Sequence, residues 1–478
     1  MSDRTTRFTA AALCLLLSAC APALKDLKAR EASLAMPESF EGQSDGPSLA
    51  EKRWEELFAD PHLVGLIDQA LKNNQELGIL FQETVISGAE LRAKRGEVLP
   101  KVDLAAGVGM EKVGLTTSQG VSDEAHEVPE YLGDFRVGLE ASWEVDIWKR
   151  LRNASKAARL RYLSTIEGRN FVVTTIVAEL ADSYYELMAL DNQLKVVETN
   201  IQILTDSLEV VKLQKEAARV TELGVQRFEA ELLRNQGHQY ELRQEIVETE
   251  NRINLLCGRM PQPVERSSDA FATLPPRDVG LGTPAMLLEN RPDVRAAELR
   301  LEAAKLDVKS ARAMFYPSLG IDGRLGYEAY AIAKLGATPE SLLIDAAGRL
   351  VAPLLNRSAI NANYRTANAQ QMQAVLDYER TLLEAYTEVT NRRSRLENLN
   401  QSYQRKAEQV QTLEQAIETS TVLFRSARAD YLEVLTTRRE ALESQMELIE
   451  TKQRQLSAEV DLYQALGGGW RPSTSATN

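Results

Sequence analysis

One segment leads directly to the element that dominates the chain: Phe135-Arg136-Val137-Gly138-Leu139-Glu140-Ala141-Ser142-Trp143-Glu144. Its apolar residues alternate with polar or small ones, and this period of two predicts a β-strand with one apolar face. From about Leu151 the pattern changes to a helical period. It continues to about Ala217 without a proline, and Gly168 is its single glycine. A strand is therefore expected to lead into a helix about 100 Å long.

The same elements occur twice along the chain. The first set comprises a helix over 60–98 that stops at Leu99-Pro100, strands around 102–110 and 135–144 separated by a polar loop (112–133), the long helix (151–217) and a helix over 221–256. The second set comprises a helix over 291–314 that stops at Tyr316-Pro317, strands around 319–327 and 346–352, and helices over 358–425 and 431–466. Pro100 and Pro317 are 217 residues apart, and Arg150 and Arg357 are 207 apart. These offsets predict an internal duplication.

Four strands and two very long helices place a strong constraint on assembly. Helices of this length bury their apolar residues against neighbouring helices, as in coiled coils. Four strands cannot close a barrel within one chain, and an open sheet edge is not tolerated in lipid. If the strands lie in a membrane, other copies must complete the sheet, and three chains would supply twelve strands around a water-filled lumen.

Composition excludes several classes of function. The net charge of −13, with no basic stripe to offset it, argues against nucleic-acid binding. The three histidines, His62, His126 and His238, are too scattered to form a metal-ligand motif, and no phosphate loop or nucleophile-elbow motif is present. We therefore expect no catalytic residue, no bound metal and no cofactor.

The N-terminus has the features of a secretion signal. Arg4 and Arg7 precede an apolar stretch that is too short to span a membrane, and it ends in Leu17-Ser18-Ala19-Cys20, which resembles a bacterial lipobox. Cys20 would then become the acylated N-terminus of the mature protein and carry palmitate. The alternative is an ordinary signal peptide with a chance cysteine. Cys257 would be the single remaining thiol, which excludes an intrachain disulfide and indicates a small buried residue.

Several stretches carry a family resemblance. They are Trp54-Glu55-Glu56-Leu57-Phe58-Ala59-Asp60-Pro61, Leu66-Ile67-Asp68-Gln69-Ala70-Leu71-Lys72-Asn73-Asn74, Trp143-Glu144-Val145-Asp146-Ile147-Trp148, Arg291-Pro292-Asp293-Val294-Arg295-Ala296-Ala297-Glu298 and Glu459-Val460-Asp461-Leu462-Tyr463-Gln464-Ala465-Leu466-Gly467-Gly468-Gly469-Trp470. In this order, over roughly residues 50–470, they resemble the TolC-like outer membrane factor family, specifically its lipoprotein branch of OprM- and NodT-type efflux ducts.

The resemblance implies an α+β membrane protein. Three chains would form a twelve-stranded β-barrel in the outer membrane, continuous with a twelve-helix α-barrel in the periplasm. The implied domains are a lipoprotein signal peptide (1–19), a lipid-anchored N-terminal segment at an equatorial belt (20–59), a first repeat (60–257), an equatorial connector (258–284), a second repeat (285–466) and a C-terminal tail (467–478).

The resemblance also implies a function and partners. The protein would be the exit duct of a tripartite efflux or export system, fed by a periplasmic adaptor protein and an inner-membrane pump. A lipid-anchored periplasmic coiled-coil scaffold without transport is the alternative. It accounts for the helices but not for the four alternating strands or the lipobox.

Two sets of site residues follow from the resemblance. The adaptor-docking tips would be the turns between long helices, formed by Ala218, Arg219, Val220, Thr221 and Glu222 in the first repeat and by Ala427, Arg428, Ala429, Asp430 and Tyr431 in the second. Family tips typically have glycine where Ala218 and Ala427 stand. The alternative is that these turns are solvated hairpins without a partner.

The closed periplasmic aperture would involve Leu432, Thr436 and Arg439, with Arg227 nearby. The middle position is commonly aspartate in the family. Because Thr436 carries no charge, the usual charge lock is expected to be weakened or moved, and Glu433 and Arg438 are further candidates. The alternative is that these charges merely solvate an exposed helical face.

Overall fold

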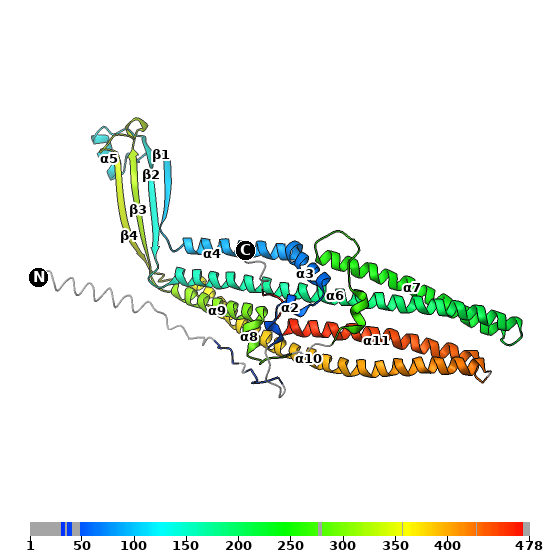
Figure 1. The fold of residues 1–478 in the computed structure, drawn as a ribbon. Helices are drawn as coiled ribbons and strands as arrows, with labels where there is room; N and C mark the ends of the chain where they lie inside the picture. Colours follow the sequence, from blue (N-terminus) through cyan, green and yellow to red (C-terminus); the bar gives the residue numbers. More distant parts are fainter. Residues whose placement is uncertain are drawn as a thin grey trace. The chain divides into compact units, whose positions relative to one another are not determined.

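The computed structural model describes residues 30–33, 36–40, 48–275, 280–355, 357–426 and 428–471. The signal peptide, Cys20 and Ala427 lie outside these residues. The chain divides into two compact units. The first, here called the sheet unit, consists of Met1–Ala32, Thr84–Ser164 and Glu298–Asp377, and the second, the helical unit, consists of Ser33–Glu83, Thr165–Ala297 and Tyr378–Asn478. Figure 1 labels their helices and strands.

The sheet unit contains four antiparallel strands. They are β1 (Lys101–Glu111), β2 (Leu132–Val145), β3 (Ser318–Ala329) and β4 (Leu342–Val351), paired in chain order (Figure 1). The central β2–β3 pair joins the two repeats, with Leu139 opposite Leu325. Both edge strands, β1 and β4, have one unpaired edge within the described chain. All four predicted strands are present, although β4 begins earlier than the pattern indicated.

The two faces of the sheet differ in chemistry. One face carries apolar side chains in register, for example Leu104 opposite Leu139 and Leu325 opposite Ile344. These side chains are exposed in the single chain, with Leu104 at 76% and Ile344 at 71%. The opposite face carries polar, charged and glycine residues. Burial against the rest of this chain therefore cannot be what stabilises the apolar face.

Parts of several helices complete the sheet unit. They belong to α4 (Gln75–Gly96), α6 (Arg150–Glu216), α9 (Pro292–Ala313) and α10 (Ser358–Arg425). A small core joins α9 to α10, where the rings of Phe315 and Tyr364 meet edge to face at 5.9 Å. The junction between β2 and α6 is held by hydrogen bonds. Asp146 accepts hydrogen bonds from the first-turn N–H of Leu151 at 3.1 Å, and Trp148 donates to the carbonyl of Pro317 at 2.8 Å.

The sheet unit also contains two short helices, and the first of them corrects the sequence prediction. Residues 112–133 were expected to be loop, but α5 (Ser118–Ala125) forms there. Thr117 caps it by accepting a hydrogen bond from the N–H of Gly120 at 3.1 Å. A short 3₁₀ helix, η3 (Ile332–Lys334), lies between β3 and β4.

The helical unit consists mainly of two long hairpins. One comprises α6 and α7 (Glu222–Leu256), and the other comprises α10 and α11 (Tyr431–Ala465) (Figure 1). The shorter elements are η1 (Leu49–Glu51), α2 (Trp54–Leu57), α3 (Pro61–Asn73), η2 (Ser268–Thr273) and α8 (Met286–Asn290). The core draws on both repeats, with Tyr184, Leu187 and Tyr463 almost fully buried. Within the described ranges, no helix combines the length and the apolar character needed to cross a bilayer.

The helix expected over 60–98 is in fact two helices, α3 and α4, which break at Asn74. The side chain of Asn74 accepts a hydrogen bond from the N–H of Leu77 at 3.2 Å and donates to the carbonyl of Leu256 at 2.9 Å. An asparagine that binds nearby backbone groups competes with a continuous helix. The side chain of Asn74 therefore joins the break between α3 and α4 to the end of α7.

Buried charge explains one of the family-like stretches. Arg291 is 5% exposed and binds both oxygens of Asp293, at 3.0 and 2.7 Å. Its remaining nitrogen donates to Glu388 and to the carbonyl of Ala465, each at 2.8 Å. Gly467, with φ +90°, then passes so close to Asn290 that a Cβ would lie 2.5 Å from its carbonyl oxygen. Arginine and glycine thus dock the end of α11 against the start of α9.

Candidate functional site

The turn of the first hairpin is closed by backbone hydrogen bonds. After α6 ends, the N–H of Ala218 donates to Lys215 at 2.9 Å and that of Arg219 donates to Gln214 at 2.8 Å. This is a Schellman motif, which requires a left-handed residue, and Ala218 supplies it with φ +55°. Thr221 caps α7 by accepting from the N–H of Gly224 at 3.3 Å, and Lys215 pairs with Glu222 across the turn. Alanine here is strained, because a left-handed conformation costs it roughly 1 kcal/mol.

The second hairpin turn is closed in a related way. The N–H of Arg428 donates to the carbonyl of Leu423 at 2.9 Å, and that of Glu433 donates to Asp430 at 3.1 Å. Asp430 precedes α11 without a capping bond from its side chain. Arg428 is exposed, as Arg219 is, and no ion pair of either is found among the described residues. Each turn therefore presents one cationic side chain to solvent.

The two turns meet in a small apolar cluster, here called the tip cluster. It consists of Leu204, Leu208, Val211, Val225, Phe228 and Leu435, with Val220, Leu232 and Tyr431 packed around it. A Cβ on Gly224 would lie 2.7 Å from a methyl group of Val220 and 3.3 Å from the ring of Tyr431. Glycine thus allows Tyr431 of the second hairpin to lie against the first. The structure brings together predicted tip residues from both repeats.

The residues predicted for the aperture do not share one environment. Leu432, 40% exposed, and Thr436 line a groove between α10 and α11 together with Leu423. Arg439 lies 3.9 Å from Glu443, and Arg234 of α7 reaches the same carboxylate at 3.9 Å. The second hairpin is therefore linked to the first through Glu443, a residue that the sequence did not single out.

The remaining candidates are not part of that link. Arg227 is exposed on α7, and within the described part of the chain it makes no ion pair. Glu433 is exposed and lines the same groove as Leu432. Arg438 lines a hollow beside Lys195 and Asn200 of α6, and burial lowers the pKa of its guanidinium. The aperture residues thus do not form one cluster in the single chain.

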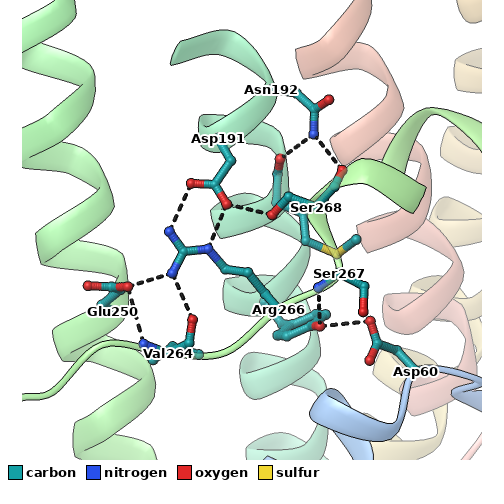
Figure 2. Close-up of polar contacts among 10 residues, drawn as sticks. Asp60, Asp191, Asn192, Glu250, Val264, Arg266, Ser267 and Ser268 are labelled. Atoms are coloured by element: carbon teal, nitrogen blue, oxygen red, sulfur yellow. Dashed lines mark hydrogen bonds and ion pairs between the residues drawn. The ribbon is translucent and has the colours of Figure 1, made fainter. Parts of the chain in front are cut away.

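The connector between the repeats is fixed by a network that the sequence did not reveal. Figure 2 shows Arg266 donating to both oxygens of Asp191 on α6, at 2.6 and 2.8 Å, and to Glu250 on α7 at 2.5 Å. It also donates to the carbonyl of Val264 at 2.8 Å. Hydrogen bonds to Asp191, more than those to Glu250, raise the pKa of Arg266. One guanidinium therefore joins the connector to two long helices.

Neighbouring contacts extend this network. Asn192 donates to the carbonyl of Ser268 at 2.9 Å, and the N–H of Ser267 donates to the hydroxyl of Tyr184 at 3.3 Å (Figure 2). That hydroxyl in turn donates to Asp60 at 2.7 Å. The start of the chain, α6 and the connector are thus held together by side chains from three distant parts of the sequence.

A further charged group lies between α6, α10 and α11. Arg392 binds Asp461 at 2.6 Å, and Arg395 lies 3.6 Å from the same carboxylate. Burial raises the pKa of Asp182 to about 7, and the nearby charge of Asp461 adds to the shift. One oxygen of Asp182 is buried with no hydrogen-bond partner in the described structure. Asp182 therefore keeps its proton at mildly acidic pH, where an ordinary aspartate is ionised, and loses it as the pH rises through about 7.

Neither a cluster of metal-ligating side chains nor a reactive thiol is found among the described residues. They contain no group of three or more His, Cys, Asp or Glu side chains that could hold a metal ion. Cys257 is fully buried, and burial raises the pKa of its thiol, which opposes reactivity. Its Sγ lies 3.6 Å from the carbonyl of Leu66. The prediction of a small buried residue at position 257 therefore agrees with the structure.

Comparison with known proteins gives a consistent result. The family model for the outer membrane efflux protein matches residues 66–259 and 283–468. The pyoverdine export outer membrane protein OpmQ of Pseudomonas putida is 28% identical over 437 residues, covering 90% of both chains. The cation efflux system protein CusC of Escherichia coli is 26% identical over 433 residues, covering 87% of this chain and 88% of that protein.

A solved structure shows the same fold. The open state of the MtrE outer membrane channel from Neisseria gonorrhoeae superposes with a TM-score of 0.81 at 21% identity, covering 93% of this chain and 98% of that one. All three proteins are named as export, efflux or channel components rather than as enzymes. The chain therefore belongs to the outer membrane efflux protein family and is an outer-membrane efflux channel.

Proposed function

We propose that three copies of the chain form the exit duct of a tripartite system, in which a periplasmic adaptor and an inner-membrane pump deliver small molecules to it. Three sheets would join edge to edge into a twelve-stranded barrel. The long hairpins of the three chains would form a twelve-helix tunnel below it. The N-terminal segment, the connector and the C-terminal tail would form a belt around that tunnel.

The observation that carries this proposal is the sheet itself. One of its faces is apolar and exposed, and both edge strands have an open edge in the single chain. In lipid, an unpaired backbone N–H or carbonyl costs several kcal/mol. Pairing β1 of one copy with β4 of the next satisfies these groups and places the apolar face toward lipid. Twelve strands leave a lumen wide enough for water.

The hairpin turns are proposed as the adaptor-docking tips. They present Arg219 and Arg428 to solvent on two turns that the tip cluster holds together. An exposed pair of turns is suited to contact a partner, and the buried cluster behind the turns maintains their spacing. Residues Ala218, Val220, Thr221, Glu222, Ala427, Ala429, Asp430 and Tyr431 complete the proposed surface.

The gate is proposed to depend on packing more than on a charged ring. Leu432 is partly exposed in the groove beside Thr436, which has no charge, and Arg439 is 3.9 Å from Glu443 of its own helix. A leucine contributed by each of three copies could close the lumen through apolar contact. Such a contact is insensitive to salt, whereas exposed ion pairs are screened.

The lipid anchor is proposed at Cys20. The Cys20→Ser variant should lose labelling by a radiolabelled fatty acid and accumulate as the unprocessed precursor. Labelling equal to that of the wild type would rule out Cys20 as the acylated residue. The barrel itself should still insert, so the anchor is expected to assist assembly rather than to determine it.

The shared barrel can be tested by crosslinking its edge strands. In a Cys257→Ala background, cysteines introduced along β1 at positions 103, 105 and 107 are combined in turn with Asp345→Cys on β4. We expect a disulfide-linked ladder up to three chains for at least one combination. The control pairs Glu140→Cys of the inner strand β2 with Asp345→Cys, and it should give no ladder. Equal crosslinking of the control would contradict edge pairing.

A further inference from the structure

The two hairpins of the helical unit pack against each other at two levels, and a hollow lies between these levels. Near the turns, Leu435 of α11 belongs to the tip cluster, which also contains residues of α6 and α7. Further along α11, Met446 packs against a second cluster, formed by Leu190, Val197 and Leu242. Between these two levels, side chains of α6, α10 and α11 line a space of about 370 Å³. We call this space the hairpin hollow.

The walls of the hairpin hollow combine aliphatic side chains with positive charge. Four aliphatic residues contribute to them, namely Val196, Ile203, Ile417 and Leu442. The charged residues that line the hollow are Arg438 of α11 and the exposed Lys195 of α6. No carboxylate of the described residues lines it. Mostly apolar walls with a few polar groups are typical of sites for small molecules.

Arg438 is the unusual group in this hollow. Its side chain is half-buried, and it makes neither a hydrogen bond nor an ion pair with any described residue. Burial lowers the pKa of its guanidinium, and no carboxylate of the described structure opposes that shift. An arginine still keeps its proton in such a place. Because charges removed from water are normally paired in proteins, Arg438 lacks an expected counter-charge.

Acidic residues on the same three helices have other partners. Glu443 of α11 lies near two other arginines. Glu198 of α6 pairs with Arg243 at 3.1 Å. Glu414 of α10 accepts a hydrogen bond from the side chain of Gln445 at 3.1 Å. These carboxylates therefore do not neutralise Arg438.

We infer that the hairpin hollow binds a small aliphatic carboxylate, whose headgroup is recognised by Arg438. A guanidinium donates two parallel hydrogen bonds to a carboxylate, which fits its planar fork. The aliphatic walls would remove the chain of the ligand from water. Such a ligand would contact α6 and α11 at once and would join the two hairpins. The site lies within one chain, so the inference does not depend on the number of chains in the duct.

Binding is tested with hexanoate by calorimetry on the whole protein in a mild detergent, with detergent alone as the blank. The wild type should bind one hexanoate per chain. Arg438→Gln should weaken binding about tenfold or more, because charge-assisted hydrogen bonds are lost. Arg439→Gln changes the exposed neighbour and is the matched control, which should stay within about twofold of the wild type. Absence of binding by the wild type, or equal binding by Arg438→Gln, would overturn the inference.

Two further probes test the class of ligand. Hexanol has the chain without the charge, and inorganic phosphate has the charge without the chain. Each should bind at least about tenfold more weakly than hexanoate, because each lacks one of the two interactions. Hexanol that binds as tightly as hexanoate would refute recognition by Arg438. Phosphate that does so would refute the assignment to an aliphatic acid.

The location is tested by protection of a thiol. In a Cys257→Ala background, Thr199→Cys places a thiol at the hairpin hollow, and hexanoate should slow its reaction with a neutral maleimide. Glu198→Cys is the matched control, because position 198 is also exposed but does not line the hollow. Its labelling rate should not change. Equal protection of both thiols, or of neither, would place hexanoate elsewhere and overturn the inference.

The stability of the protein without ligand separates a free acid from an acidic side chain of another copy. If Arg438 has no counter-charge, Arg438→Gln removes a half-buried charge and should leave the unfolding temperature unchanged or raise it. A lower unfolding temperature, or dissociation of the assembled protein, would show that a neighbouring chain already pairs with Arg438. That result would overturn the inference. Failure to form a channel would refute the duct but would not change the binding of hexanoate.

Discussion

Replacement of Arg266 should release the connector from the long helices. The guanidinium makes four hydrogen bonds, two to Asp191, one to Glu250 and one to the carbonyl of Val264. Its side chain is only 16% exposed, as is that of Glu250. Arg266→Ala would leave two carboxylates close together in a poorly hydrated place. Breaking such a pair costs about 3 kcal/mol or more.

The effect should be local, because Arg266 joins the connector to α6 and α7 but lies outside the main apolar core. Hydrogen exchange of peptides that cover 263–275 is the suitable assay, since exchange reports the free energy of local opening. A loss of about 3 kcal/mol corresponds to roughly hundredfold faster exchange, because the exchange rate follows the opening equilibrium when closing is faster than chemical exchange. Arg266→Lys keeps the charge but not the fork geometry, so we expect an intermediate effect.

An exposed ion pair in the same segment is the matched control. Lys195 lies 3.4 Å from Asp269 of η2, and the two side chains are 73% and 98% exposed. Exposed pairs contribute little, so Lys195→Ala should change exchange by less than about threefold. If Arg266→Ala accelerates exchange no more than Lys195→Ala does, then the network of Figure 2 does not hold the connector, and the reasoning is wrong.

Three further changes have distinct signatures. Ala218→Gly should slow exchange at the first hairpin turn by a few fold, because glycine adopts the left-handed conformation without the strain of alanine; faster exchange would contradict this. The pKa of Asp182 is raised to about 7, so ionising this buried acid destabilises the fold. Its contribution to the free energy of unfolding is therefore complete below pH 4 and is lost as the pH rises through about 7, by at most roughly 4 kcal/mol. Asp182→Asn should therefore raise the unfolding temperature at pH 8 but not at pH 4, and equal shifts at both would argue against a buried acid. Leu432→Ala should increase resting conductance more than Arg439→Ala does, and the reverse order would favour a charge-based gate.

The regular elements were largely predictable because their periodic patterns continue over many residues without interruption. The helix expected over 358–425 has those bounds in α10, and the one expected over 151–217 is α6, shifted by one residue. The strands were predictable where polar and apolar residues alternate strictly. The predicted start of β4 lies too far along the chain, because Leu342, Leu343 and Ile344 are all apolar and hide the alternation.

Local side-chain chemistry accounts for the elements that were missed. The break at Asn74 depends on one side chain that binds Leu77 and Leu256, and no change of period marks it. The short helix α5 depends on a cap at Thr117 within a polar stretch that resembles a loop. An asparagine or threonine at these positions was the available signal.

The positions of the site residues along the chain were predictable from the sequence, but their contacts with one another were not. The hairpin turns followed from the two repeats, yet the approach of Tyr431 to Gly224 joins residues from different repeats. Likewise, nothing near Arg266 in the sequence points to Asp191, which lies 75 residues away. Such pairings depend on how the helices pack, and one sequence does not specify them.

The mass of the purified protein tests the central claim most directly. After extraction in a mild detergent, light scattering coupled to size-exclusion chromatography gives the mass of the protein apart from its detergent. The shared barrel predicts a single species close to three times the mass of one chain. A monodisperse single chain that retains the strand content of the folded protein would contradict it.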